Sequence, residues 1–304
     1  MGSQGKKKKI NKKSTALKIF FIGLFFILFI LPVLIAPTVE KHMQKSPADF
    51  VEFINVGQRD CTLIKSGNEA AIIDFGVESS GKRIYKRLLE YGIESIDTAI
   101  ITHHHSDHMG GFLKLAKKIE IKRLIIGNTT AEDGERDIYN SIISLARSMN
   151  IKIILPQIGN IFKIGNASIE ILAYDSAAPE ENNRSVIFKL CILNNSLLFT
   201  GDAENTAELN LAKSEAIKCD ILKLGHHGSD TSSCTEFLKA VSPEITIASC
   251  GYDNSYNHPA ADVEQRLKEY NIKYLRTDLN RSIRLTFNSN KNTYAVTTER
   301  GFFK

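Results

Sequence analysis

The sequence predicts a mixed α/β fold (α+β) in which two β-sheets pack face to face and helices cover both outer faces, a four-layer αββα sandwich. Two observations support this fold. Short apolar segments of strand length open each half of the chain beyond residue 48, and helical and strand-like segments then alternate. The 304 residues are 43% hydrophobic and 24% charged, which is typical of a globular protein and favours one domain of about 250 residues over two equal ones.

The first 47 residues have a different composition. Residues 1–39 contain seven lysines and no acidic residue, and the stretch 17–36 is almost entirely apolar and about long enough to cross a hydrocarbon core. Lysines on its amino side predict a basic cytoplasmic tail at residues 1–16, a transmembrane signal anchor at 17–36, a linker at 37–47 and an extracytoplasmic domain at 48–304. A cleaved signal peptide, which would make the protein secreted, and a buried core helix are the alternatives.

Charge and cysteine content each exclude one class of protein. Of the 39 basic residues, seven lie in residues 1–39, which leaves 32 against 34 acidic residues in the rest of the chain. Proteins that bind long nucleic acids usually carry a basic excess, so no strong basic nucleic-acid surface is predicted on the domain. The five cysteines form no CxxC pair and are odd in number, which does not indicate a disulfide scaffold.

The first half of the domain is predicted to begin with three consecutive antiparallel strands, because its apolar segments are short and separated by turn residues. Helical spacing of Ile84 and Leu88 then predicts the first helix. The predicted strands lie at residues 50–56, 61–65, 70–74, 96–101, 122–126 and 151–155, and the predicted helices at 81–91, 112–118 and 138–150.

The second half repeats this alternation without detectable sequence identity to the first. Its strands and helices are predicted by the same apolar periodicities. The predicted strands lie at residues 169–172, 186–193, 197–200, 221–224, 245–249, 273–276, 283–287 and 293–298, and the predicted helices at 203–213, 235–241 and 260–270.

A histidine-rich run follows a predicted buried strand. Residues 103–108 read HHHSDH, directly after the apolar segment 98–102. Four histidines and an aspartate within six residues, at the carboxyl end of a strand, are typical of a metal centre rather than of a solvated loop.

The spacing within this run predicts which side chains bind the same metal ion. His103 and His105 point the same way if strand geometry persists, so that both imidazoles can bind one ion, whereas His104 points away. Asp107 and His108 begin the next turn and can face a second ion about 3.5–4 Å from the first, the spacing that two-metal hydrolases use.

Two later strands also end in polar groups. The segment FTGD ends at Asp202, and LKLGHHGS places His226 and His227 after the strand at 221–224. Ligands collect at the carboxyl ends of strands in α/β proteins, so Asp202 is predicted as a bridging ligand. Of the two histidines, one is predicted as a ligand and the other as a supporting or substrate-binding residue.

These segments, together with FINVGQRDCTLI and AIIDFG, resemble the metallo-β-lactamase superfamily, and specifically the hydrolase domain of ComEC-type competence proteins in a free-standing, membrane-anchored form. The resemblance covers about residues 50–287. It implies that Asp74 orders the ligand loop from behind the metal ligands. It also implies the ligands themselves: His103 and His105 for the first ion, Asp107, His108 and His226 for the second, and Asp202 between them.

Two positions depart from the pattern of the superfamily. Most members place a further histidine between the first motif and the bridging acid, but here residues 181–185 offer amides and a hydroxyl, among them Asn182 and Ser185, as supporting groups. Arg59 stands where the usual DVGQGD segment has glycine, which closes off backbone conformations of positive φ and predicts a differently shaped loop.

The implied activity is hydrolysis by a metal-bound hydroxide. One or two divalent ions, zinc or alternatively manganese, lower the pKa of bound water from about 15.7 towards about 7. Asp107 and Asp202 are the expected acidic catalytic residues. His227 or His258 is expected to stabilise developing charge or to protonate the leaving group.

The resemblance implies a phosphodiesterase acting on nucleic acid, such as extracellular DNA, or on a cell-wall phosphodiester. Hydrolysis of an acyl substrate, which includes lactones, thioesters and β-lactams, is one alternative. A membrane-tethered binding protein on a degenerate hydrolase scaffold is an alternative of another class. The expected partners are the membrane, through the N-terminal helix, and the phosphodiester substrate.

Overall fold

The computed structural model describes residues 23–25, 28, 48–128, 134–288 and 293–302. By its internal contacts the chain divides into two units, Met1–Ser46 and Pro47–Lys304, and the second unit carries the fold described below. The predicted tail and linker, and most of the predicted anchor, fall outside the described residues. Among those that are described, no helix is both long and apolar enough to cross a membrane.

The first half of the domain and the C-terminal strands form a nine-stranded mixed sheet with the order β18-β17-β16-β1-β2-β3-β5-β7-β8. Pairing is antiparallel from β18 to β3, as predicted for the first three strands, and parallel from β3 to β8. The strands are β1 (Phe50–Phe53), β2 (Thr62–Ser66), β3 (Glu69–Ile73), β5 (Thr98–Ile100), β7 (Arg123–Ile125), β8 (Lys152–Ile154), β16 (Ile283–Asn288), β17 (Thr293–Thr298) and β18 (Gly301–Phe302).

The second half forms a seven-stranded sheet with the order β15-β14-β13-β12-β11-β10-β9. Strands β9 to β12 pair antiparallel and β12 to β15 parallel. The strands are β9 (Ile161–Ile164), β10 (Ala167–Ala173), β11 (Ile187–Ile192), β12 (Asn195–Phe199), β13 (Ile221–Lys223), β14 (Ile245–Ala248) and β15 (Lys273–Arg276).

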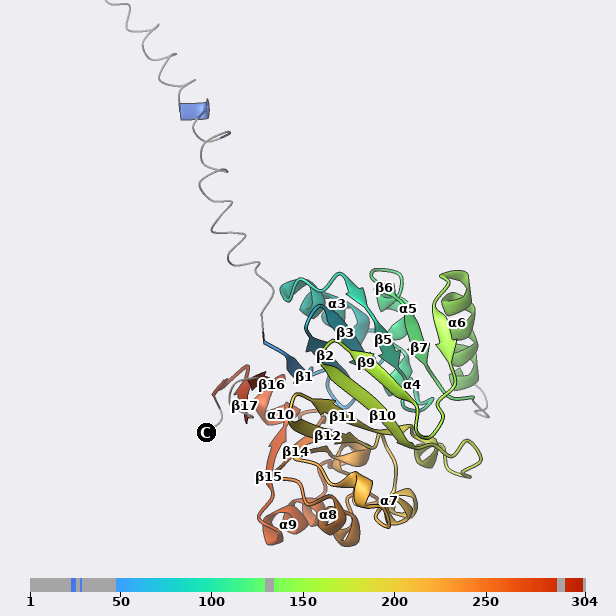
Figure 1. Ribbon diagram of the computed structural model, residues 1–304, viewed down its shortest axis with the longest axis vertical. Coiled ribbons are helices and arrows are strands. Elements are labelled where there is room, and N and C mark those ends of the chain that lie inside the picture. The colour runs from blue at the N-terminus through green and yellow to red at the C-terminus, as the bar shows by residue number, and fades with distance from the viewer. Residues whose placement is uncertain (1–22, 26–27, 29–47, 129–133, 289–292, 303–304) are drawn as a thin grey trace, which may run out of the picture. The chain divides into compact units, whose positions relative to one another are not determined.

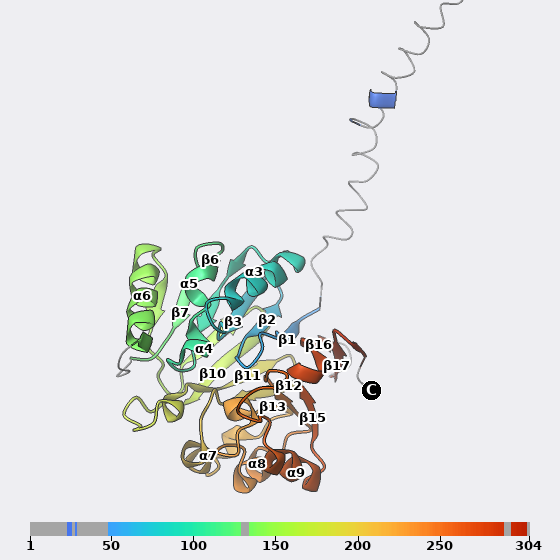
Figure 2. The same cartoon turned by 180° about the vertical axis from the view of Figure 1, so that it is seen from behind.

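Three hydrophobic clusters separate four layers, which confirms the predicted mixed α/β architecture. The central cluster lies between the sheets, where the ring of Phe199 stacks on those of Phe53 and Phe188 at centroid distances of 6.0 and 5.0 Å. The other two clusters lie beneath the outer helices, which Figures 1 and 2 show on opposite sides of the paired sheets. These helices are α3 (Ser80–Glu90), α5 (Phe112–Leu115) and α6 (Gly134–Ser148) on one side, and α7 (Asn205–Leu211), α8 (Thr235–Val241) and α9 (Ala261–Glu269) on the other.

The inner strands are apolar on both faces because each face meets a packed layer. In β1, Phe50 joins the cluster under the helices, whereas Val51 and Phe53 join the cluster between the sheets. The same alternation separates Leu63 from Ile64 in β2. Continuous apolar runs in the sequence are therefore strands with period-two packing.

Some predicted elements differ from those observed. The predicted strand 96–101 is two strands, because Asp97 interrupts it to accept a hydrogen bond from the amide of Ala70, and only β5 joins the large sheet. Its first part is β4 (Ser95–Ile96), which pairs with β6 (Glu120–Ile121). Apolar periodicity did not predict β6, β9 and β18, nor the helices α4 (Ser106–Met109) and α10 (Thr277–Asn280), which are too short to show a periodicity.

Candidate metal centre

The candidate metal centre lies where both sheets present the carboxyl ends of their strands. Asp74 follows β3 and residues 103–108 follow β5 on the nine-stranded sheet, while Asp202 follows β12 on the seven-stranded sheet. Several sets of three ligand atoms lie within 4.8 Å of one another: His103, His108 and Asp202; Asp107, His108 and His227; Asp60, Asp202 and His227; and Asp60, Asp74 and His108. The fold thus gathers residues that are far apart in sequence at one point.

Asp74 lies behind the ligand loop and holds it by three hydrogen bonds. Thr102 donates to the carboxylate from its amide at 2.9 Å and from its hydroxyl at 2.8 Å, and Nδ1 of His108 donates at 2.9 Å. The backbone φ of Asp74 is 55°, a region that few residues other than glycine adopt. Because Nδ1 of His108 binds Asp74, its Nε2 is directed at the centre and is the nitrogen that a metal ion would bind after displacing a proton.

His227 is oriented in the same manner as His108. Its Nδ1 donates to the carbonyl oxygen of Ser249 at 2.9 Å, which directs Nε2 at the centre. That atom lies 3.4 Å from Oδ2 of Asp107 and 3.5 Å from Oδ2 of Asp202. Nε2 of His108 lies 3.2 Å from the same oxygen of Asp202, and neither Nε2 atom has a hydrogen-bond partner among the described residues. Each of these buried nitrogens needs a cation between it and the carboxylates, which is a proton when no ion is bound and the metal ion once it binds.

His103 and His105 form the other half of the centre. Nε2 of His103 lies 3.0 Å from Nδ1 of His105 and 3.9 Å from Oδ2 of Asp202. The His103 side chain is fully buried, and that of His105 is 36% exposed. The close approach of two imidazole nitrogens agrees with the sequence prediction that both can bind one ion.

His226 is not placed at the centre, so the structure does not support its prediction as the ligand of this motif. Its imidazole is partly exposed, and Nδ1 lies 3.2 Å from the hydroxyl of Thr231 and 3.4 Å from Oε1 of Glu204. The reason is the backbone, because His226, His227 and Gly228 all have positive φ, of 47°, 55° and 86°. This left-handed turn aims the first imidazole outward and the second inward, and such strained conformations concentrate at functional sites.

Charges at the centre shift the pKa values of its residues. Burial alone would lower the pKa values of His108 and His227, but the surrounding carboxylates outweigh it and raise both, so these imidazoles are protonated until a metal ion displaces the protons. Burial alone would raise the pKa of Asp202, but the imidazoles of His108 and His227 outweigh it and hold the pKa well below its usual range. The same imidazoles outweigh burial at Asp107 and lower its pKa. Burial lowers the pKa of His103 well below its ordinary value, so that this imidazole is neutral and able to bind a metal. Imidazole nitrogens and carboxylate oxygens are donors that suit zinc, and also manganese.

Asp60 and Lys223 also reach the centre, and the sequence analysis assigned neither of them a role. They form a buried ion pair with 2.6 Å between Nζ and Oδ2. Oδ1 of Asp60 lies 3.8 Å from Nδ1 of His227 and has no hydrogen-bond partner among the described residues. One signal was available, because Lys223 is a charged residue inside an apolar buried strand and such a residue requires a partner.

The segment 181–185 supports the centre at one position. The hydroxyl of Ser185 accepts a hydrogen bond from the amide of Asp202 at 3.0 Å, which fits its predicted supporting role. Asn182 instead donates to Oε1 of Glu204 at 3.0 Å, beside His226 rather than at the ligands. His104, predicted to point away, has Nδ1 2.8 Å from Oε1 of Glu181 and Nε2 3.1 Å from a backbone carbonyl oxygen.

His258 lies at the outer rim of the centre. Its Nδ1 is 3.3 Å from Nε2 of Gln58, whose Oε1 accepts the amide of Gly251. Gln58 therefore donates to Nδ1, and the ring proton of His258 is on Nε2. Burial, followed by the neighbouring histidines, lowers the pKa of His258 to about 4, so the ring is neutral at pH 7. The ring centroids of Tyr256, His258 and His226 follow one another at 5.6 Å intervals, from an exposed tyrosine inward.

Arg59 does not distort its loop. Its φ is not positive, and the residue that takes a positive φ in this segment is Gly57, at 83°. The Arg59 guanidinium donates to the carbonyl oxygen of Val56 at 3.1 Å. The substitution of the expected glycine is therefore tolerated without backbone strain.

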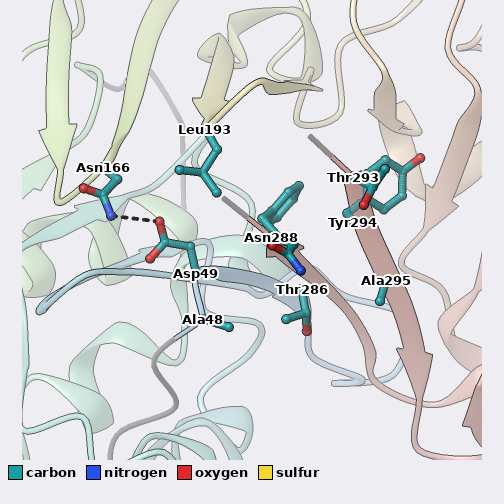
Figure 3. Close-up of a pocket in the computed structure, with 10 residues that line it drawn as sticks. Ala48, Asp49, Asn166, Leu193, Thr286, Asn288, Thr293, Tyr294 and Ala295 are labelled. Atoms are coloured by element: carbon teal, nitrogen blue, oxygen red, sulfur yellow. Dashed lines mark hydrogen bonds between the residues drawn. The ribbon is translucent and has the colours of Figure 1, made fainter. Parts of the chain in front are cut away.

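The cavity in Figure 3 lies at the opposite end of the sheets, where β1 begins and β16 ends. Its one carboxylate, that of Asp49, already accepts hydrogen bonds from Ser66, Gly67 and Asn166. Its side chains offer no cluster of ligand or nucleophilic groups, so we assign it no function.

Comparison with known proteins gives matches to one family. The family described as Metallo-beta-lactamase superfamily matches residues 54–172. The chain is 28% identical over 291 residues to ComE operon protein 3 of Bacillus subtilis, a match that covers 89% of this chain and 36% of that protein. It is 30% identical over 229 residues to Competence protein ComA of Neisseria gonorrhoeae, covering 74% of this chain and 30% of that protein. The chain spans about a third of the length of these curated relatives.

Solved structures that match this chain share its fold. The metallo-β-lactamase fold protein YhfI of Bacillus subtilis matches with a TM-score of 0.51 and 13% identity, covering 75% of this chain and 95% of that one. CmlA, a diiron β-hydroxylase from Streptomyces venezuelae, matches with a TM-score of 0.53 and 15% identity, covering 79% of this chain and 54% of that one. Identities this low show a shared fold alone.

Proposed function

We propose that this chain, whose residues 54–172 match the metallo-β-lactamase superfamily and which is similar to competence proteins, is a metal-dependent hydrolase and acts as an extracytoplasmic phosphodiesterase. The observation that carries the proposal is the convergence of the unpartnered Nε2 atoms of His108 and His227 on the carboxylates of Asp107 and Asp202. A buried set of this kind fits a divalent cation.

Two groups of residues would hold the ions. His103 and His105 would hold one of them, and Asp107, His108 and His227 the other. Oδ2 of Asp202 faces both groups, and its Oδ1 is buried without a partner among the described residues, so Asp202 can serve both ions. When bound, the ions would polarise the scissile group and lower the pKa of water enough to give a nucleophile at neutral pH.

The protein's own groups contribute orientation and hydrogen bonding. Asp74 and Ser249 fix the ring positions of His108 and His227, so the donor geometry is in place before the substrate arrives. His258 is neutral at pH 7 and carries its proton on Nε2, which suits a hydrogen bond to charge that develops on the substrate rather than general-acid catalysis.

A phosphodiester is the preferred substrate class because relatives of this chain are named for competence and, in Haemophilus influenzae, for recombination, which are processes of DNA. The lysine-rich tail and the apolar stretch at 17–36 support a membrane anchor with the domain outside the cytoplasm. Acyl hydrolysis is the second candidate, because the same superfamily name refers to a β-lactamase.

Parallel assays separate these candidates. The full chain, supplied with zinc or manganese, is assayed on bis(p-nitrophenyl) phosphate and on a chromogenic β-lactam, with the His105→Ala variant as the control. Turnover of the phosphodiester that is lost in the variant supports the proposal. Turnover of the β-lactam alone would contradict it, and no turnover of either substrate with either metal would favour a binding protein on a hydrolase scaffold.

A further inference from the structure

A basic cavity lies on the same end of the nine-stranded sheet as the metal centre. It has a volume of about 250 Å³, and the loop after β1, the helix α3 and the start of β16 border it. Figure 1 shows α10, β16 and β1 together in this part of the fold. Its charged lining consists of Arg83, Lys86, Arg87 and Arg281 against Glu90 and Glu299.

The carboxylates of this cavity are already paired. Arg87 binds Glu52 at 3.3 Å and Glu90 at 3.0 Å, and it also contacts Glu299. Lys86 lies 3.8 Å from the same Glu90. The lining therefore keeps an excess of two positive charges, although the chain beyond its basic tail is slightly acidic.

The two remaining cations have no acidic partner among the described residues. The guanidinium of Arg83 donates to the backbone carbonyl oxygen of Asn55 at 2.5 Å. Arg281 is exposed, and none of the described residues forms an ion pair or hydrogen bond with its side chain. Guanidinium groups that are free of carboxylates and face one cavity can form paired hydrogen bonds with a phosphate.

Arg281 also has a backbone conformation that favours glycine. Its φ is 61° and its ψ is −146°, a combination that strains the backbone of a residue with a side chain. The next residue fixes this geometry, because the Ser282 hydroxyl accepts hydrogen bonds from the amide of Asn55 and from Arg87. A glycine would relieve the strain, yet the position holds an unpaired arginine, which points to a function for its charge.

One loop connects this cavity to the metal centre. Asn55 borders the cavity, and its Oδ1 accepts the amide of Gly57. Gln58 follows and contacts His258, and Asp60 belongs to the metal centre. A substrate polymer that lies along this loop would reach both the cavity and the metal centre.

We propose that this cavity is an anion subsite in which Arg83 and Arg281 bind a second phosphate of a polymeric phosphodiester while another is held at the metal centre. The inference rests on the proposed phosphodiesterase activity and specifies its substrate class, a polymer with repeated phosphates rather than an isolated diester. Single-stranded nucleic acid and polyol-phosphate polymers share this chemistry.

Chain-length dependence tests the subsite. The full chain is compared with Arg281→Gly, with Arg83→Ala and with Lys117→Ala, an exposed control lysine that follows α5 and does not line the cavity. The substrates are bis(p-nitrophenyl) phosphate, a single-stranded DNA oligonucleotide and poly(glycerol phosphate). We expect either arginine variant to lose about tenfold in kcat/KM, mainly through KM, on at least one polymer and to keep the wild-type value on the small diester. The polymer that is affected identifies the natural source of the phosphates.

Two further measurements separate charge from structure. In equilibrium binding of the oligonucleotide, each arginine variant should reduce the slope of log affinity against log salt by about 0.7, the share of one phosphate contact on a single strand. Arg281→Gly should raise the melting temperature because it removes backbone strain. A lower melting temperature would instead assign Arg281 a structural role and overturn the proposal.

The outcomes distinguish the subsite from the function on which it rests. If the arginine variants act on the small diester and on both polymers with the kinetics and affinity of the wild type, the subsite alone is overturned. Failure of the wild type to hydrolyse any diester would overturn the phosphodiesterase function, and the binding measurements would still decide the subsite.

Discussion

Nδ1 of His108 donates a 2.9 Å hydrogen bond to Oδ2 of Asp74, a residue held at a positive φ of 55°. The bond determines which nitrogen of His108 faces the metal centre. It couples the strained end of β3 to the ligand loop after β5, so the geometry of the centre depends on a residue that does not face the substrate.

Replacement of Asp74 by Asn tests this coupling. The amide keeps the size of the side chain but lacks the charge that holds the His108 proton, so we expect metal affinity to fall by about 10–100-fold. A competition titration with a chromogenic chelator measures the affinity. Unchanged affinity in Asp74→Asn would contradict the role of this bond.

The two neighbouring histidines in the turn after β13 provide a matched pair of variants. Because Nε2 of His227 faces Asp107 and Asp202 while His226 contacts Thr231 and Glu204, His227→Ala should lose bound metal and His226→Ala should retain it. Elemental analysis of both proteins, prepared identically, gives the comparison. The reverse result would restore His226 as the ligand of this motif.

The buried pair of Asp60 and Lys223 is expected to control folding stability. Lys223→Met leaves the Asp60 carboxylate buried without its cation, which should lower the free energy of unfolding by about 3–5 kcal/mol. The double variant Asp60→Asn, Lys223→Met should recover most of this loss, because no unpaired charge remains. Urea denaturation measures both values, and a loss below about 1 kcal/mol in the single variant would show that the pair is not coupled to stability.

The sequence predicted most of this fold, because apolar periodicity survives in elements that pack against a layer. Helix α8 at 235–241 and strands β15 at 273–276 and β17 at 293–298 have the predicted bounds. Strand β9 was missed because it is a partly exposed edge strand at 161–164 whose apolar residues do not alternate cleanly.

The sequence predicted the ligands that directly follow strands. It was less informative where the tertiary structure determines which side chain faces the metal centre. His103, Asp107, His108 and Asp202 lie together because strand ends meet at one edge of each sheet. The choice between His226 and His227 depends on a left-handed turn that no residue pattern indicates. The pairing of Asp60 with Lys223 joins two segments that are distant in sequence, so only the folded chain reveals it.

Glu208 predicts a pH dependence of stability that is separate from the metal centre. It is fully buried in α7, where its carboxylate accepts the amides of Ser233 and Cys234, and burial raises its pKa to about 7 from 4.5. Because the folded pKa is higher than the unfolded one, this group's contribution is fully present below about pH 4.5 and is lost as the pH rises through 7.

Comparison with Glu208→Gln isolates this effect, because all other titrating groups cancel. The stability of the wild type relative to the variant should fall by roughly 3 kcal/mol between pH 4.5 and pH 8. Denaturation midpoints and slopes at intervals across this range give the difference. A constant difference would show that Glu208 titrates normally in the folded protein.

The most direct test of the account is the metal content of the full chain after zinc or manganese is supplied and excess ion is removed. Two groups of ligands share Asp202, so we predict about two ions per chain; the ligands are His103, His105, Asp107, His108, Asp202 and His227. The Asp107→Ala, His108→Ala variant should bind at most one ion. A wild-type chain that binds no divalent ion under either condition would contradict the assignment of this centre and, with it, the hydrolase function.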